Sequence, residues 1–105
     1  MSDFMIKRVC QISFNGSDFS DLSISFGAPK VEPKYGMFEC RVGLECSYFS
    51  VTLDSKGQDE AQAFFMLPYI VKGYLNSKIE EGYSVYWLQE GDWDKADFWR
   101  YSDHL

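Results

Sequence analysis

The sequence predicts an α+β fold in two layers, with one long helix packed on one face of an antiparallel meander sheet of four to five strands. Apolar and polar residues alternate through the first half of the chain, which is typical of strands with one buried face. A single later stretch, residues 59–81, repeats apolar residues at steps of three and four, which is typical of a helix. A chain of 105 residues forms one modest core, so we expect a single α+β domain over residues 1–105.

Four strands are expected before the helix, each with alternating apolar residues: 4–14, 21–26, 35–44 and 48–53. Asn15 and Gly16 favour a tight turn between the first two, because both tolerate positive φ. Residues 27–34, with two prolines, are expected to form a loop, and residues 54–58 a polar link to the helix. A fifth strand is expected at residues 83–88, which are rich in strand-forming residues.

The expected helix has recognisable start and stop signals. Asp59 suits the N-cap, and Gln62 completes a capping-box pattern three residues later. Gly82 suits a left-handed C-terminal cap. Pro68 predicts a kink rather than an end, because the apolar stripe keeps its phase across it. That stripe is expected to face the sheet: Ala61, Phe64, Phe65, Pro68, Val71, Leu75 and Ile79.

The net charge of −6 is concentrated near the C-terminus. Residues 80–105 hold seven acids against two bases, whereas residues 1–79 hold nine against eight. Such a field repels nucleic acid and anionic membranes and attracts basic partners. We therefore expect no direct nucleic-acid binding and no membrane association. No apolar run approaches the about 20 residues of a membrane span, and the N-terminus lacks the order of a secretory signal, so a cytoplasmic location is expected.

Three cysteines offer the most reactive side chains of the sequence, and none lies in a Cys-x-x-Cys pair. Cys10 and Cys40 fall on the apolar phase of expected strands, where a thiol acts as a small hydrophobe. An enzyme acting through Cys40 or Cys46 stays as an alternative, which requires a thiol of lowered pKa.

No pattern in the sequence indicates another kind of chemistry. Phosphate-binding loops, dinucleotide-binding glycines and zinc-helix motifs are absent from the sequence, and the single histidine is His104. The acids at positions 92, 94 and 97 lack the glycine and terminal glutamate of a calcium loop. We expect a protein that is not an enzyme, with no cofactor, no metal and no catalytic residue.

Residues 88–105 form an acidic, aromatic C-terminal segment. Either its rings fold back and close the core, or some stay exposed as anchors for a partner. Tryptophan and tyrosine are typical interface residues, and surrounding acids speed encounter with a basic protein. The candidate contact residues are Glu90, Asp92, Trp93, Asp94, Asp97 and Trp99.

The chain also resembles a family of small uncharacterised bacterial domains. In that family a Gly-x-Asp-x-x-Gln-Ala helix start follows a Gly-x-Pro loop and an aromatic-x-Cys strand, as residues 57–63, 27–29 and 38–40 do here. The resemblance covers roughly residues 9–87, while Pro68 and the acidic C-terminal segment depart from the pattern. It implies a bacterial origin and the order of strands and helix, and it transfers no catalytic residue.

The functional hypothesis is a protein-binding inhibitor of immunity type, which neutralises a basic bacterial toxin such as a nuclease. Charge asymmetry and aromatic content motivate it, together with the association of small acidic bacterial proteins with this role. One alternative is a phage-encoded inhibitor of a nucleic-acid-handling complex, of anti-CRISPR or DNA-mimic type, which would compete with nucleic acid. Another is a structural subunit, or a homodimer that pairs through an open sheet edge.

Overall fold

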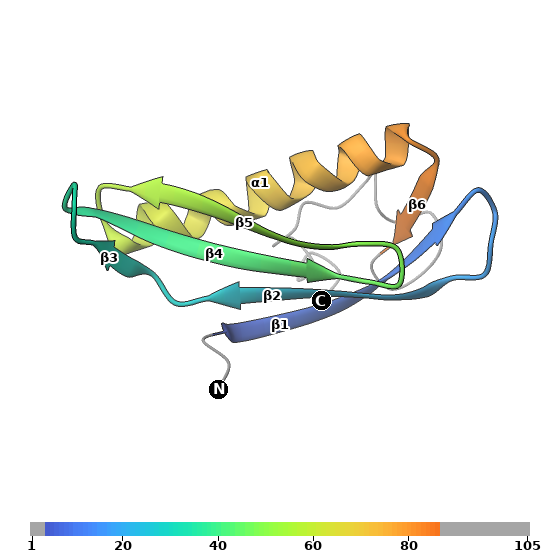
Figure 1. The fold of residues 1–105 in the computed structure, drawn as a ribbon, viewed down its shortest axis with the longest axis horizontal. Coiled ribbons are helices and arrows are strands. Elements are labelled where there is room, and N and C mark those ends of the chain that lie inside the picture. Colours follow the sequence, from blue (N-terminus) through green and yellow to red (C-terminus); the bar gives the residue numbers. More distant parts are fainter. Residues whose placement is uncertain (1–3, 87–105) are drawn as a thin grey trace, which may run out of the picture.

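The computed structural model of the protein describes residues 4–86 and has two layers, an antiparallel sheet and one helix (Figure 1). The α+β class is therefore confirmed. The helix α1 spans Glu60–Glu80. The strands are β1 (Phe4–Phe14), β2 (Ser20–Gly27), β3 (Lys30–Glu32), β4 (Met37–Glu45), β5 (Ser50–Gly57) and β6 (Tyr83–Tyr86).

Strands β1, β2, β4 and β5 pair in chain order, as the expected meander does. Strand β6 joins the far edge of β1, so α1 connects strands at opposite edges of the sheet. The expectation of a loop over residues 27–34 was wrong in part, because residues 30–32 form β3 beside the start of β4. Since β5 occupies one edge of β4 along its length, β2 and β3 share the other edge. The backbone N–H and C=O groups of β4 that do not pair with β2 thus find hydrogen-bond partners in β3.

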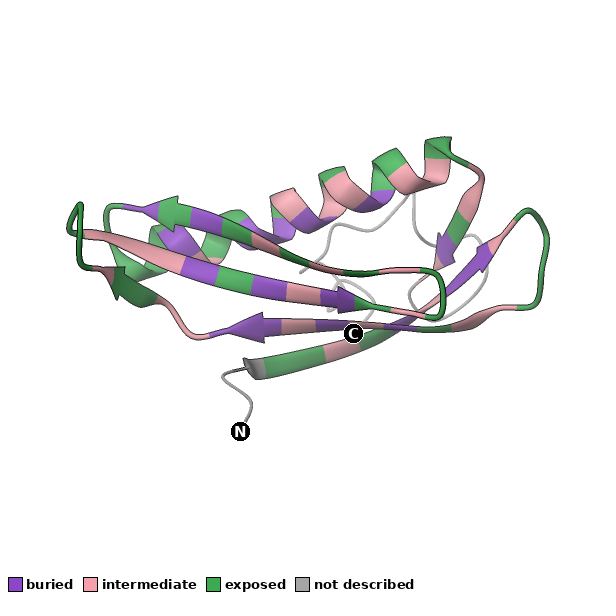
Figure 2. Ribbon diagram, viewed as in Figure 1, coloured by how far each residue is buried: buried purple, intermediate pink, exposed green. Residues whose placement is uncertain are grey.

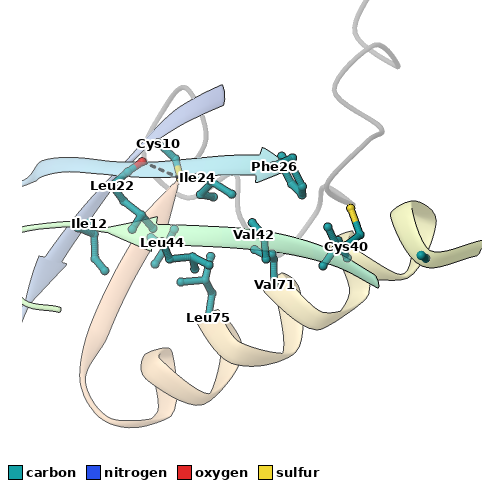
Figure 3. Close-up of a cluster of buried hydrophobic side chains, with 13 residues drawn as sticks. Cys10, Ile12, Leu22, Ile24, Phe26, Cys40, Val42, Leu44, Val71 and Leu75 are labelled. Carbon is teal, nitrogen blue, oxygen red and sulfur yellow. Dashed lines mark hydrogen bonds between the residues drawn. The ribbon is translucent and has the colours of Figure 1, made fainter. Parts of the chain in front are cut away.

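The core lies between the sheet and α1 (Figure 3). Strand residues with apolar alternation point inward as expected, and Figure 2 shows buried positions alternating with intermediate ones along β2 and with intermediate or exposed ones along β4. The largest fully buried side chains come from both layers: Ile12, Leu22, Ile24, Leu44, Leu67 and Leu75. Their burial removes apolar surface from water and drives the helix onto the sheet.

The helix packs on the sheet with five of the seven residues expected, since Pro68, Val71 and Leu75 are buried and Phe64 and Ile79 pack against the core. Its buried residues are Ala63, Leu67, Pro68, Val71 and Leu75, whereas Ala61 and Phe65 are exposed. Residues 61–71 are apolar almost all round the helix, so more than one stripe fits the sequence. The stripe at steps of four from Ala63 is the one that packs. Pro68 lies inside α1, which continues past it to Glu80.

The end of β5 and the first turn of α1 form a close junction. Residues 54–57, expected as part of a polar link, continue β5, and the buried Ser55 hydroxyl donates a hydrogen bond to the Ala63 carbonyl. Asp59 Oδ1 accepts from the Gln62 backbone N–H at 2.7 Å, which confirms the expected N-cap. A Cβ atom on Gly57 would lie 2.6 Å from the backbone nitrogen of Ala63, so only glycine fits there without a shift.

We predict that Gly57→Ala lowers the free energy of unfolding by about 1–3 kcal/mol, because the new methyl group overpacks the junction. Gly73→Ala is the matched control, since a Cβ there meets nothing within 4 Å. Because Gly73 lies in the middle of α1, Gly73→Ala is expected to raise the free energy of unfolding by roughly 0.5–1 kcal/mol. Urea unfolding followed by far-UV circular dichroism measures both variants. A Gly57→Ala protein as stable as the wild type would contradict the packing described.

Candidate partner-binding surfaces

The contact residues predicted from the sequence lie outside the part of the chain that the structure describes: Glu90, Asp92, Trp93, Asp94, Asp97 and Trp99. The structure does describe β6, the strand that precedes them, and β6 ends at Tyr86, which pairs with Gln11 of β1. Residues 4–86 hold ten acids and eight bases, so most of the net charge of −6 falls in residues 1–3 and 87–105.

Large apolar side chains are exposed on the side of α1 that faces away from the sheet. Phe65 is 65% exposed, Met66 44% and Tyr69 59%, and the helix in Figure 2 shows exposed positions along this side. We call these three residues the α1 apolar face. No charged residue occurs between Glu60 and Lys72, although the solvent side of a surface helix normally carries charged and polar groups. An exposed apolar surface of this kind is typical of an interaction site.

This surface was not predicted from the sequence, because Phe65 was expected to face the sheet. The available signal was the run of residues 61–71, which lacks any charge. Once one stripe of that run packs on the sheet, its remaining apolar residues must face outward.

An aromatic cluster attaches the C-terminal end of α1 to β6. Tyr83 contacts Phe14 and Tyr48, with ring centroids 4.6 and 5.4 Å apart. Lys78 Nζ lies 5.2 Å from the centroid of Phe49, which also packs against Tyr74. Burial lowers the pKa of Lys78, but Tyr74, Glu81 and Tyr83 outweigh burial and the pKa is raised. The cluster therefore joins β1, the β4–β5 turn, α1 and β6.

The face of the sheet opposite α1 pairs several of its charges internally. Glu39 accepts from Lys56 Nζ at 2.7 Å and from Arg41 Nε at 3.0 Å. The hydrogen bond from Lys56 lowers the pKa of Glu39 below its ordinary value. Glu39, Arg41 and Lys56 together carry a charge of +1, so this part of the sheet does not add to the negative field.

Two of the three thiols are buried, as the sequence indicated. Cys10 and Cys40 are fully buried. Cys10 Sγ donates to the carbonyl of Leu22 at 3.8 Å (Figure 3), and Cys40 Sγ donates to the carbonyl of Gly27 at 3.1 Å. Burial raises the pKa of Cys40, which opposes the thiolate that a nucleophile needs. Cys46 is half-buried. Cys40 therefore packs as a small hydrophobe.

The described part of the chain holds neither a cluster of metal-ligating side chains nor a helix that could span a membrane. Within residues 4–86, no three histidine, cysteine, aspartate or glutamate side chains gather as metal ligands would. No helix in the same range has the length and apolarity needed to cross a bilayer. No protein-family model matches the chain, and comparison with curated proteins and with solved structures finds no significant match.

We predict that Cys46 reacts with a maleimide in the folded protein at least about tenfold faster than Cys10 or Cys40, because only the half-buried thiol reaches solvent without unfolding. Mass spectrometry of peptides from timed quenches gives the three rates. Labelling of Cys40 as fast as that of Cys46 would contradict its structural role. Labelling in urea should equalise all three thiols and serves as the control.

Proposed function

We propose that this protein is a non-enzymatic inhibitor of immunity type, which binds and neutralises a basic protein such as a bacterial toxin nuclease. The observation that carries the proposal is the α1 apolar face. Phe65, Met66 and Tyr69 stand exposed on a helix that is capped at its start and packed along its length. Side chains held on a rigid element lose little conformational freedom on binding, so they suit the anchors of an interface.

Charge supports a basic partner. The α1 apolar face follows directly after Asp59 and Glu60, and no basic residue occurs in the chain between them and Lys72. The whole chain carries −6, with the excess near the C-terminus. A negative field of this kind steers a cationic protein and raises the association rate at low salt. In this proposal the acids and tryptophans of residues 90–99 form a second contact region with the same partner.

Apolar and acidic groups have separate roles in the proposed complex. Burying an exposed aromatic ring in the partner slows dissociation, because its contacts must break before the proteins separate. Acidic groups at the rim act mainly on association and are screened by salt. Variants of the two kinds are therefore expected to change different rate constants.

The test begins with capture of the partner from the native host and its purification. For the reconstituted pair, we predict that Phe65→Ala weakens Kd by about tenfold or more, mainly through faster dissociation, measured by surface plasmon resonance. Tyr35→Ala is the matched control, because Tyr35 is 68% exposed on the β3–β4 turn and is not part of the proposed surface. It is expected to change Kd by less than about twofold.

Variants of the C-terminal segment test the second contact region. Asp94→Lys is expected to slow association and to reduce its salt dependence, and Trp93→Ala to speed dissociation. A captured partner that is acidic, or one that binds Phe65→Ala as tightly as the wild type, would contradict the proposal. Self-association that Phe65→Ala abolishes, with no basic partner, would instead assign the α1 apolar face to a homodimer.

A further inference from the structure

A second surface feature lies on the sheet face opposite α1, where β6 meets β1. Strand register pairs Ser13 with Ser84 and Gln11 with Tyr86. Because Ile12 and Val85 between them point into the core, these four side chains face away from the helix. A pocket of about 400 Å³ opens here, in the size range of small-ligand sites. The residues lining it that matter to its chemistry are Ser13, Ser17, Phe19, Ser84 and Tyr86.

Contacts among ring and hydroxyl groups hold the walls of this pocket in place. Phe19 and Tyr86 pack against each other with ring centroids 4.8 Å apart and planes at 58°. Ser17 Oγ accepts from the Phe14 backbone N–H at 3.1 Å and lies 2.8 Å from the hydroxyl of Tyr48. The turn after β1 and the end of β6 are therefore fixed relative to each other, and the pocket is formed before anything enters it.

Ser13 is the feature that points to a ligand. The residue is 2% exposed and lines the pocket, yet no residue of the described range 4–86 supplies a hydrogen-bond partner for its hydroxyl. Buried polar groups are almost always hydrogen-bonded, so a buried hydroxyl that has no partner within residues 4–86 is available to a ligand that enters the pocket. The neighbouring Ser84 hydroxyl also has no hydrogen-bond partner among these residues, which gives two hydroxyl groups on one face of the pocket.

We propose that this pocket holds an arginine side chain of the basic partner, and this step rests on the function proposed above. Hydroxyl oxygens of Ser13 and Ser84 accept hydrogen bonds from a guanidinium group, which has five donors and no acceptor. The faces of Phe19 and Tyr86 suit a planar, weakly hydrated cation. No basic side chain lines the pocket among the described residues.

Charge around the pocket favours the same ligand. Asp18 lies in the turn between Ser17 and Phe19, and Asp21 accepts from Gln11 Nε2 at 2.7 Å beside the Tyr86 register position. The chain then continues from Tyr86 into residues 87–105, which hold five acids and two bases. Asp18 and Asp21 thus supply negative charge beside the pocket that complements an arginine.

The test uses the full-length protein and small probes, so it does not depend on having the partner. N-acetyl-arginine methylamide is titrated against the ¹⁵N-labelled protein and compared with the lysine and citrulline analogues and with methyl glucoside. The expected result is saturable binding of the arginine probe with amide shifts centred on Ser13, Ser84 and Tyr86, at least about threefold tighter than the lysine probe. The neutral citrulline probe is expected to bind more weakly still.

Variants separate binding from folding. Ser13→Ala is expected to weaken arginine binding at least about threefold while the melting temperature stays equal or rises, because the buried hydroxyl that it removes has no hydrogen-bond partner within residues 4–86. Ser23→Ala, on the same sheet face in β2, is the matched control and should leave the affinity unchanged. Equal binding of arginine and citrulline, tighter binding of methyl glucoside, or shifts away from the pocket would overturn the proposal. A clear loss of stability in Ser13→Ala would also overturn it, since the hydroxyl would then have a structural partner.

The two proposals fail in different ways. If the arginine probe binds in the pocket but no basic protein partner exists, the pocket assignment stands on its own and the inhibitor function falls. If a basic partner binds through Phe65 but the probe does not enter the pocket, the inhibitor function stands and the arginine assignment falls.

Discussion

The structure depends on one close contact, between the end of β5 and the first turn of α1. Gly57 leaves no room for a side chain beneath Ala63, and the Ser55 hydroxyl holds the Ala63 carbonyl. With Ala63 held against the sheet, the 3.6-residue repeat turns Leu67, Val71 and Leu75 inward as well. The same rotation forces the rings of Phe65 and Tyr69 outward. An interior packing constraint thus determines which apolar residues a partner can reach.

The other end of the helix has a comparable role for β6. The rings around Tyr83 and the ammonium of Lys78 bring the last described strand back to the edge of β1. This pairing places Tyr86 against Phe19 and completes the pocket over Ser13. The contacts at the start of α1 therefore position the α1 apolar face, and those at its end position the pocket between β1 and β6. The α1 apolar face lies on the helix side of the sheet, and the pocket lies on the other side. A partner engaging both would have to reach around the edge of the domain.

Much of the fold follows from local sequence patterns, and the parts that do not follow have identifiable causes. Alternation places Leu22, Ile24, Val42 and Leu44 in the core, and the turn at Asn15–Gly16 has the positive φ values that its residues favour. The predicted helix stripe was wrong only at Ala61 and Phe65, because residues 61–71 are apolar almost all round the helix and the tertiary contact at Ala63 selects which of them pack. Strand β3 has no alternation of apolar residues that would predict it. It forms because the first residues of β4 extend beyond the part that pairs with β2. The pocket combines Ser13, Phe19 and Tyr86 from separate segments, a juxtaposition that no local pattern contains.

The central claim is that this domain is a binding module whose partner covers the α1 apolar face and the β1–β6 pocket. Carbene footprinting of the purified protein, alone and with its captured partner, tests that claim most directly. The account predicts that labelling falls at Phe65, Tyr69 and Tyr86 in the complex, while labelling at Tyr35 and Val31 stays unchanged. Protection of Arg41, Lys56 and their neighbours on the charged part of the sheet, with Phe65 and Tyr86 labelled as before, would contradict it.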